Sequence, residues 1–139
     1  MNFDLQNLGF SIQRRPDPYP ERGITLSKKY KSAAIIGLGD QGKSHNAAYS
    51  GLSNVKVIAA CEASEERLSD FIDKNPNVRG YTDAKNLFEK EDINIVSIVT
   101  NTPSHRDLTV AAVESGVPAV LCEKPMAHSP VAARQMIDI

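Results

Sequence analysis

The chain has 139 residues, of which 41% are hydrophobic and 24% charged, and its formal charge at pH 7 is −1. This near-neutral balance gives no basic field for nucleic acid and no polybasic patch for anionic lipid, so we expect neither partner. The length suits one domain, and no apolar run approaches the roughly 18 residues of a membrane-spanning helix.

Residues 1–30 differ in composition from the rest and are predicted to form an extended arm. Pro16, Pro18 and Pro20 each fix φ and lack a backbone donor, which disfavours both a helix and a central strand. Two interpretations stay open: a loosely attached tail, or an arm that packs on a partner chain. The apolar residues available for such packing are Leu5, Leu8, Phe10 and Ile12.

From residue 31 onward, short apolar runs alternate with segments of helical spacing. The runs occupy residues 33–36, 55–61, 93–99 and 117–122, and a further short strand is predicted near Tyr81. Near-continuous apolar runs are typical of strands buried on both faces, as in a parallel sheet covered by helices. Residues 31–139 are therefore predicted to form an α/β domain with a doubly wound parallel sheet of about five strands.

The segments between the runs carry helix start and stop signals. Ser64 is predicted to cap one helix, and Ser129-Pro130 to open another with proline at the first helical position. Ser104 and Asp107 form a capping-box pattern, and Gly116 is expected to end the helix that follows them.

The last four residues, 136–139, continue a helical pattern without a stop signal. A helix of about ten residues has only begun to bury its face at that point. We therefore expect the chain to be a piece of a longer protein or one chain of a split one, incomplete at the C-terminal end of this domain.

A glycine-rich segment directly follows the first apolar run. Gly37-Leu38-Gly39-Asp40-Gln41-Gly42 matches G-x-G-x-x-G between a strand and a helix, the context that strengthens this pattern. Gly37 permits a tight turn, Gly39 lets the backbone approach a pyrophosphate, and Gly42 lets the helix pack close to the strand. The helix N-terminus would present N–H groups and its positive dipole end to the phosphates. We interpret these six residues as the phosphate-binding loop of a dinucleotide-binding Rossmann domain.

An acidic residue stands where such a domain holds the adenosine ribose. Glu62 lies 20 residues after Gly42 and directly follows the run 55–61. Its carboxylate can accept hydrogen bonds from ribose hydroxyls but would repel a 2′-phosphate, and positions 63 and 64 hold no arginine. The prediction is NAD as cofactor, with NADP less favoured. The alternative is a glycine turn followed by an exposed glutamate.

The segment after the third long run is a candidate for the nicotinamide end of the site. Thr100, Asn101 and His105 follow the run 93–99, and ligands of open parallel sheets lie beyond the carboxyl ends of strands. His105 stands at a predicted helix start, where its cationic form is disfavoured. For His105 we weigh a direct cofactor contact equally against an exposed histidine without a ligand.

Glu123-Lys124-Pro125 closes the run 117–122 and is unusual at the end of a buried strand. A lysine there can hydrogen-bond a substrate hydroxyl or carbonyl and favour its charged form during hydride transfer. We therefore predict Lys124 as the catalytic residue, and Glu123 and Lys124 as cofactor contacts. The alternative for Lys124 alone is a solvated surface lysine.

The two cysteines, Cys61 and Cys122, stand in apolar runs without a CxxC or metal-ligand spacing. We expect buried thiols in a reducing compartment, a cytoplasmic location and no metal site.

Together these motifs resemble the glucose–fructose oxidoreductase, inositol dehydrogenase and MocA family over residues 31–139. The resemblance is carried by residues 37–45, 60–62, 102–105, 114–116 and 123–127, the last of these being the most specific. It implies an NAD(P)-dependent oxidoreductase acting on sugars, inositols or related polyols, with Lys124 positioning the substrate hydroxyl and a cis bond before Pro125. The chain departs mildly from the family, which commonly has aspartate at the place of Glu62 and proline at that of Asn101.

The resemblance also implies a second domain, with the substrate pocket and the proton-transferring residues, that these 139 residues do not contain. The first hypothesis is therefore the NAD-binding part of such an oxidoreductase, completed by a longer gene product or by another chain in a homo- or hetero-oligomer, and inactive alone. A non-catalytic nucleotide-binding or regulatory module is the alternative. A Rossmann domain for another nucleotide, such as CoA or a nucleotide sugar, is a third option that gives Glu-Lys-Pro no role.

Overall fold

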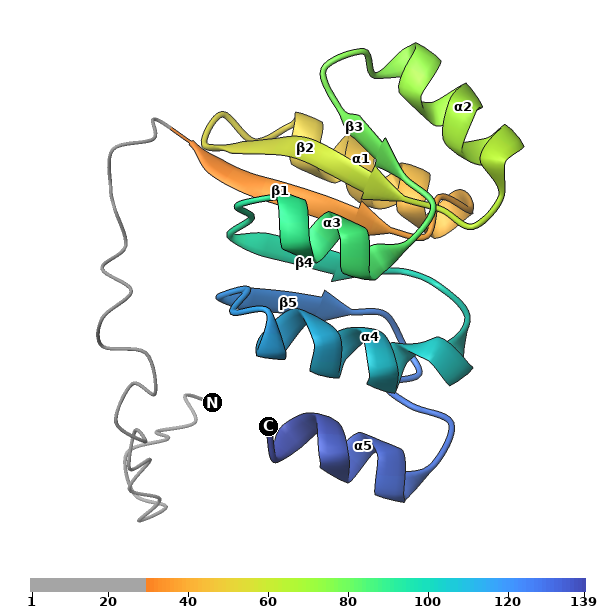
Figure 1. The fold of residues 1–139 in the computed structure, drawn as a ribbon, viewed down its shortest axis with the longest axis vertical. Helices are drawn as coiled ribbons and strands as arrows, with labels where there is room; N and C mark the ends of the chain where they lie inside the picture. Colours follow the sequence, from red (N-terminus) through yellow and green to blue (C-terminus); the bar gives the residue numbers. More distant parts are fainter. Residues whose placement is uncertain (1–29) are drawn as a thin grey trace, which may run out of the picture.

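The computed structural model describes residues 30–139, in which strands and helices alternate along the chain (Figure 1). In order, the elements are β1 (Lys31–Ile36), α1 (Asp40–Ser50), β2 (Val55–Cys61), α2 (Glu65–Lys74), β3 (Arg79–Tyr81), α3 (Ala84–Lys90), β4 (Ile95–Ile98), α4 (Thr102–Glu114), β5 (Ala119–Cys122) and α5 (Pro130–Ile137). The predicted alternation is confirmed, including the short strand at Tyr81. The predicted arm lies outside the described residues, apart from Tyr30.

The five strands form one parallel sheet in the order β3-β2-β1-β4-β5, which confirms the doubly wound fold. The chain crosses from β3 at one edge back to β4 beside β1, so the order of the strands reverses between β1 and β4. Ile36 is level with both Cys61 and Ile98, and Ile98 is level with Cys122. The residues that follow these four strands therefore meet along one edge of the sheet.

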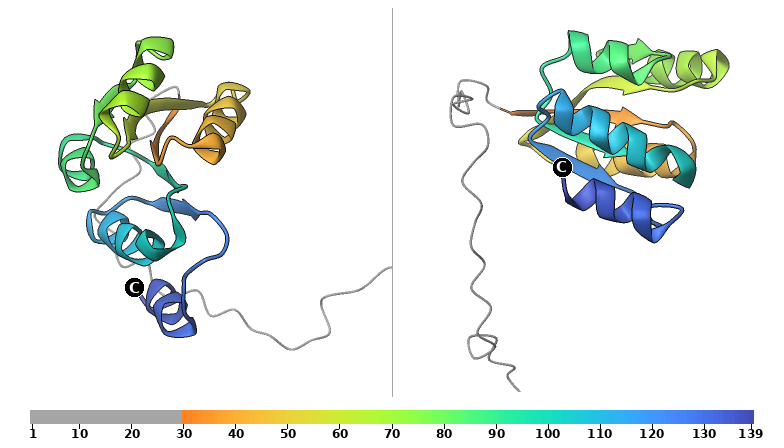
Figure 2. Two further views of the ribbon diagram at one scale, coloured as in Figure 1. Left: turned by 90° about the vertical axis from the view of Figure 1, so that its right-hand side faces the viewer. Right: turned by 60° about the horizontal axis from the view of Figure 1, so that its bottom comes forward.

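Successive strand residues face opposite sides of the sheet, and each side has its own core. Ile35 packs in one core with Phe71 of α2 and Tyr49 of α1, and Ile36 in the other with Leu87 of α3 and Ala112 of α4. Figure 2 shows the two sets of helices on opposite sides of the sheet. Burial on both sides is the physical reason for the apolar runs in the sequence.

The expectation of burial on both faces is wrong for β5. This strand is one of the two outer strands of the described sheet, its residues alternate in burial, and Leu121 is 51% exposed. Two strands are also shorter than predicted, because the buried residues Ile93, Val99 and Val117 prolong the apolar runs but lie in the connections. Burial in a connection and burial in a strand give the same sequence pattern.

Most of the predicted helix boundaries are confirmed. Ser64 and Ser129 cap α2 and α5, each accepting a hydrogen bond from a backbone N–H three residues on, and Gly116, with φ 79°, follows the end of α4. The capping box predicted from Ser104 is wrong, since α4 already begins at Thr102 with a proline in its first turn. Within residues 30–139, no helix is both long enough and apolar enough to cross a membrane.

Candidate functional site

The glycine loop leaves β1 and enters α1 at the edge where the strands end. Gly37 has φ +97°, and a Cβ at this position would lie 2.7 Å from the carbonyl oxygen of Val99. Its N–H donates to the carbonyl of Cys61 at 2.8 Å. Neither the backbone conformation nor the space admits a side chain, so the turn requires glycine.

The other two glycines of the loop differ in their surroundings. A Cβ on Gly39 would meet no atom within 4 Å, whereas a Cβ on Gly42 would lie 2.1 Å from the carbonyl oxygen of Gly37. Gly39 is the N-cap of α1 and makes no side-chain cap hydrogen bond, so it leaves the first-turn N–H groups of α1 uncapped. These residues form a cradle of backbone atoms, which fits a diphosphate.

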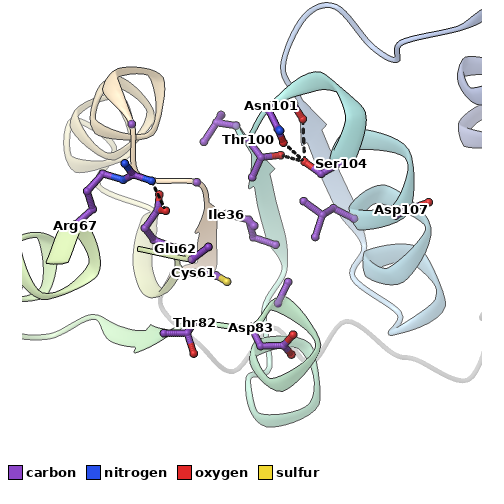
Figure 3. Close-up of a pocket in the computed structure, with 16 residues that line it drawn as sticks. Ile36, Cys61, Glu62, Arg67, Thr82, Asp83, Thr100, Asn101, Ser104 and Asp107 are labelled. Atoms are coloured by element: carbon purple, nitrogen blue, oxygen red, sulfur yellow. Dashed lines mark hydrogen bonds and ion pairs between the residues drawn. The ribbon is translucent and has the colours of Figure 1, made fainter. Parts of the chain in front are cut away.

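A cleft of about 810 Å³ opens beside the glycine loop, between the ends of β1, β2, β3 and β4 (Figure 3). Five residues that the sequence predicted as cofactor contacts line it: Gly37, Gly39, Glu62, Thr100 and Asn101. Among the other lining residues, which sequence reasoning missed, are Arg67, Thr82, Asp83, Ser104 and Asp107. The cleft lies beyond the carboxyl ends of the strands and has the size of a nucleotide site.

Glu62 follows β2 and its carboxylate accepts three hydrogen bonds. Leu38 N–H donates to Oε2 at 2.9 Å, while Ser64 N–H and the Arg67 guanidinium donate to Oε1 at 3.0 and 2.9 Å. The residue is 8% exposed, so the alternative of an exposed glutamate is wrong. Burial raises the pKa of Glu62, but the hydrogen bonds from Arg67, Ser64 and Leu38 outweigh it and lower the pKa to about 2. The charged carboxylate therefore fixes the glycine loop to the start of α2.

This lowered pKa predicts a pH-dependent contribution of Glu62 to stability. Because the folded pKa lies below the ordinary value of 4.5, the contribution is complete above about pH 5 and is lost as the pH falls toward 2. We expect Glu62→Gln to lower the free energy of unfolding by about 2 kcal/mol at neutral pH, the scale of a charge-assisted hydrogen bond. The difference from the wild type should shrink as the pH falls.

Urea denaturation of both proteins across this pH range measures the effect. Glu65→Gln, at an exposed position of the same helix, controls for the loss of one negative charge. A Glu62→Gln deficit that stayed constant down to pH 2 would show that the hydrogen bonds do not depend on the charge of Glu62.

Arg67 supplies a cation beside Glu62 that the sequence prediction did not include. Arg67 stands outside positions 63 and 64 but reaches back to Glu62 from the first turn of α2 (Figure 3). Side chains of a helix lean toward its N-terminus, so a long side chain in the first turn after the Ser64 cap can reach the end of the preceding strand.

The segment after β4 is tied together by hydroxyl contacts. The side chain of Ser104 lies 2.7 Å from Thr100 Oγ1 and donates to the Asn101 carbonyl at 2.8 Å. His105 is 1% exposed, which excludes the exposed histidine expected as the alternative. Its ring nitrogens lie 3.1 Å from the carbonyl oxygens of Pro125 and Thr100. His105 is not among the cleft residues and instead joins the segment after β4 to the turn after β5.

The Glu123-Lys124-Pro125 turn follows β5, and its Lys124–Pro125 bond is cis, as the resemblance implied. Glu123 Oε2 accepts the Lys124 N–H at 3.0 Å, and Oε1 lies 3.1 Å from His45 Nε2. The His45 hydrogen bond and then the Lys124 N–H lower the pKa of Glu123. Lys124 is exposed, and neither it nor Glu123 lines the cleft described above.

The remaining predicted residues belong to the loop and the start of α1. Leu38 is 1% exposed and packs in the core, with only its N–H directed to Glu62. Asp40 and Gln41 are exposed, and Asp40 lies 3.6 Å from the Lys43 ammonium. None of these three side chains lines the cleft.

Cys61 lines the cleft but is not a reactive thiol. Burial, and then the nearby charges of Asp83 and Glu62, raise its pKa to about 12. Cys122 is half-buried, and both cysteines are free. In the described part of the chain, no three His, Cys, Asp or Glu side chains gather in a way that could hold a metal ion.

The chain is similar to known proteins both in sequence and in structure. The family model for oxidoreductases with an NAD-binding Rossmann fold matches residues 31–139. D-apiose dehydrogenase from Paraburkholderia graminis is 34% identical over 113 residues, covering 81% of this chain and 30% of the relative. Inositol 2-dehydrogenase from Salmonella typhimurium is 30% identical over 108 residues, covering 76% of this chain and 32% of the relative.

Among solved structures, an oxidoreductase from Agrobacterium radiobacter in complex with NAD+, L-tartaric acid and magnesium superposes with a TM-score of 0.73. It is 31% identical, and the match covers 78% of this chain and 31% of that one. The chain thus spans about a third of the length of the proteins it matches.

Proposed function

The chain belongs to the glucose–fructose oxidoreductase, inositol dehydrogenase and MocA family, and its residues 31–139 match the NAD-binding Rossmann-fold domain of that family. We propose that the chain forms the nucleotide-binding part of a sugar or polyol dehydrogenase. The observation that carries the proposal is the bare backbone cradle at Gly39, which opens on the same cleft as Glu62. The Gly39 cradle suits the diphosphate of an adenosine diphosphate, and Glu62 suits its ribose.

When bound, NAD supplies the acceptor for a hydride from a carbon that bears a hydroxyl. The chain's own residues bind and orient it. Gly39 and the first-turn N–H groups of α1 bind the diphosphate, and Glu62 accepts a hydrogen bond from the adenosine ribose. Thr100 and Asn101 border the cleft on its other side. The charge of Glu62 opposes a 2′-phosphate, but the paired Arg67 guanidinium offsets part of that charge, so the preference for NAD over NADP is supported mainly by the NAD-binding family to which the chain belongs.

Lys124 is proposed to hydrogen-bond the substrate hydroxyl and to stabilise the negative charge that develops on its oxygen. This role is supported by the sheet register, which brings the end of β5 level with the ends of β1 and β4. The named relatives act on apiose and inositol, so we propose a sugar or cyclitol as substrate. Further sequence or a partner chain would supply the rest of the substrate pocket.

A cytoplasmic location is part of this proposal. It is supported by two free cysteines, one of them buried in the core beside Ile36 and Ile98. Free thiols are characteristic of reducing compartments.

Titration of the purified chain with NADH, followed by cofactor fluorescence, tests the cofactor proposal. We expect saturable binding of one NADH per chain and weaker binding of NADPH. Lys90→Ala is the matched control, because this exposed lysine at the end of α3 does not line the cleft and its loss should leave the NADH dissociation constant within about twofold, or ~0.4 kcal/mol. A folded chain that showed no binding at millimolar NADH would contradict the proposal.

A further inference from the structure

His45 connects helix α1 to the turn that carries Lys124. Its Nε2 lies 3.1 Å from Glu123 Oε1, and its Nδ1 lies 3.1 Å from the hydroxyl of Ser97 on β4. The His45 side chain is 16% exposed and Ser97 is fully buried. Three elements from distant parts of the sequence thus meet at one imidazole.

The partners of His45 determine which of its nitrogens carries a proton. A carboxylate only accepts hydrogen bonds, so Nε2 is the donor to Glu123. In the neutral ring Nδ1 is then an acceptor and takes the Ser97 hydroxyl proton. The Ser97 oxygen accepts in turn from the hydroxyl of Tyr49, which lies 2.8 Å away. Every polar group in this chain of contacts has a complementary partner.

The chain of contacts continues to the backbone of Lys124. Glu123 uses one carboxylate oxygen for His45 and the other for the Lys124 N–H at 3.0 Å. The Glu123 side chain is 23% exposed and is therefore partly shielded from solvent. Without the His45 contact, Glu123 would be free to rotate toward water and leave the Lys124 N–H without its acceptor.

We propose that His45 is a positioning residue that holds Glu123 and thereby fixes the backbone of Lys124 relative to the phosphate-binding helix. The inference rests on the proposed function, in which Lys124 meets the substrate and α1 holds the cofactor. It gives Glu123 a structural task in place of the cofactor contact predicted from the sequence. It also explains why a histidine stands one turn after the glycine loop, at a position that does not line the cleft.

Two substitutions separate the two nitrogens of the imidazole. The amide of glutamine reaches the place of Nε2 and keeps a donor for Glu123, whereas the shorter asparagine amide replaces Nδ1 and keeps only the Ser97 contact. In His45→Asn we expect the Lys124 amide proton to exchange with water at least about tenfold faster, as for a lost charge-assisted hydrogen bond. In His45→Gln the rate should stay within about twofold of the wild type.

Amide exchange measured by NMR on the 15N-labelled chain provides the readout. Unchanged exchange in both variants, or equal acceleration in both, would overturn the proposal, since equal acceleration indicates that only the packing of the ring matters. If His45→Asn does not fold, His45→Phe serves instead, because it keeps a planar ring and removes both nitrogens. Faster Lys124 exchange is then expected, and an unchanged rate would equally overturn the proposal.

An NADH titration of the same samples separates this inference from the proposed function. Failure of the wild-type chain to bind NADH would refute the cofactor proposal. The exchange rates would still decide whether His45 holds the Lys124 turn.

Discussion

Gly39→Val is expected to weaken NADH binding by at least about a hundredfold, or ~2.7 kcal/mol, without unfolding the chain. Gly39 has φ −67° and ψ −165°, a conformation that any residue adopts, and its Cβ would meet no protein atom within 4 Å. In the proposed function, the space in front of Gly39 is where the diphosphate approaches the backbone. A branched side chain therefore obstructs the ligand and not the fold.

Fluorescence titration gives the NADH affinity of this variant, and urea denaturation gives its stability. Gly51→Ala is the matched control at the opposite end of α1, where the added Cβ would lie 3.4 Å from the carbonyl oxygen of Ala48. It should preserve the NADH affinity. Full NADH affinity in Gly39→Val would show that the diphosphate does not bind at this cradle.

Gly42→Ala, in contrast to Gly39→Val, is expected to disturb the fold itself and to lower the free energy of unfolding by roughly 3 kcal/mol. The added Cβ would lie 2.1 Å from the carbonyl oxygen of Gly37 and 3.0 Å from its carbon. Both are backbone atoms of the turn, which cannot move aside as a flexible side chain does. Helix α1 must therefore shift away from the strand that it follows.

Thermal unfolding is a direct measure of this loss, with an expected decrease in Tm on the order of 15 °C for a domain of this size. NADH affinity should fall too, because the turn and the helix N-terminus move together. A variant as stable as the wild type would mean that the close packing of α1 on the turn is not required. The two glycines thus separate a binding defect from a folding defect within one loop.

The sequence was sufficient for the parts of the molecule that repeat a local pattern. Apolar runs marked the strands because both sides of the sheet are covered, and the spacing from Gly42 placed Glu62 at the end of β2, where it lines the cleft. These signals act over one strand and one helix. Local patterns therefore predicted the parallel sheet and the residues at its edge.

The contacts and exposures that the sequence did not predict depend on residues that lie close together only in the folded chain. His45 and Glu123 are 78 positions apart, and no local pattern marks their hydrogen bond. His105 follows a strand end, yet the fold turns its ring inward to two carbonyls. Leu121 has the same apolar surroundings in the sequence as the residues of inner strands, and only the order of the sheet reveals that it is exposed.

Because β5 lies at an edge of the described sheet, its outer side differs from those of the inner strands. Among residues 30–139, no strand pairs with the far side of β5, so no strand hydrogen bonds satisfy its backbone amides and carbonyls there. The exposed side chain of Leu121 adds apolar surface on the same strand. This edge is therefore the place where a further strand, of this polypeptide or of another, would extend the sheet by one.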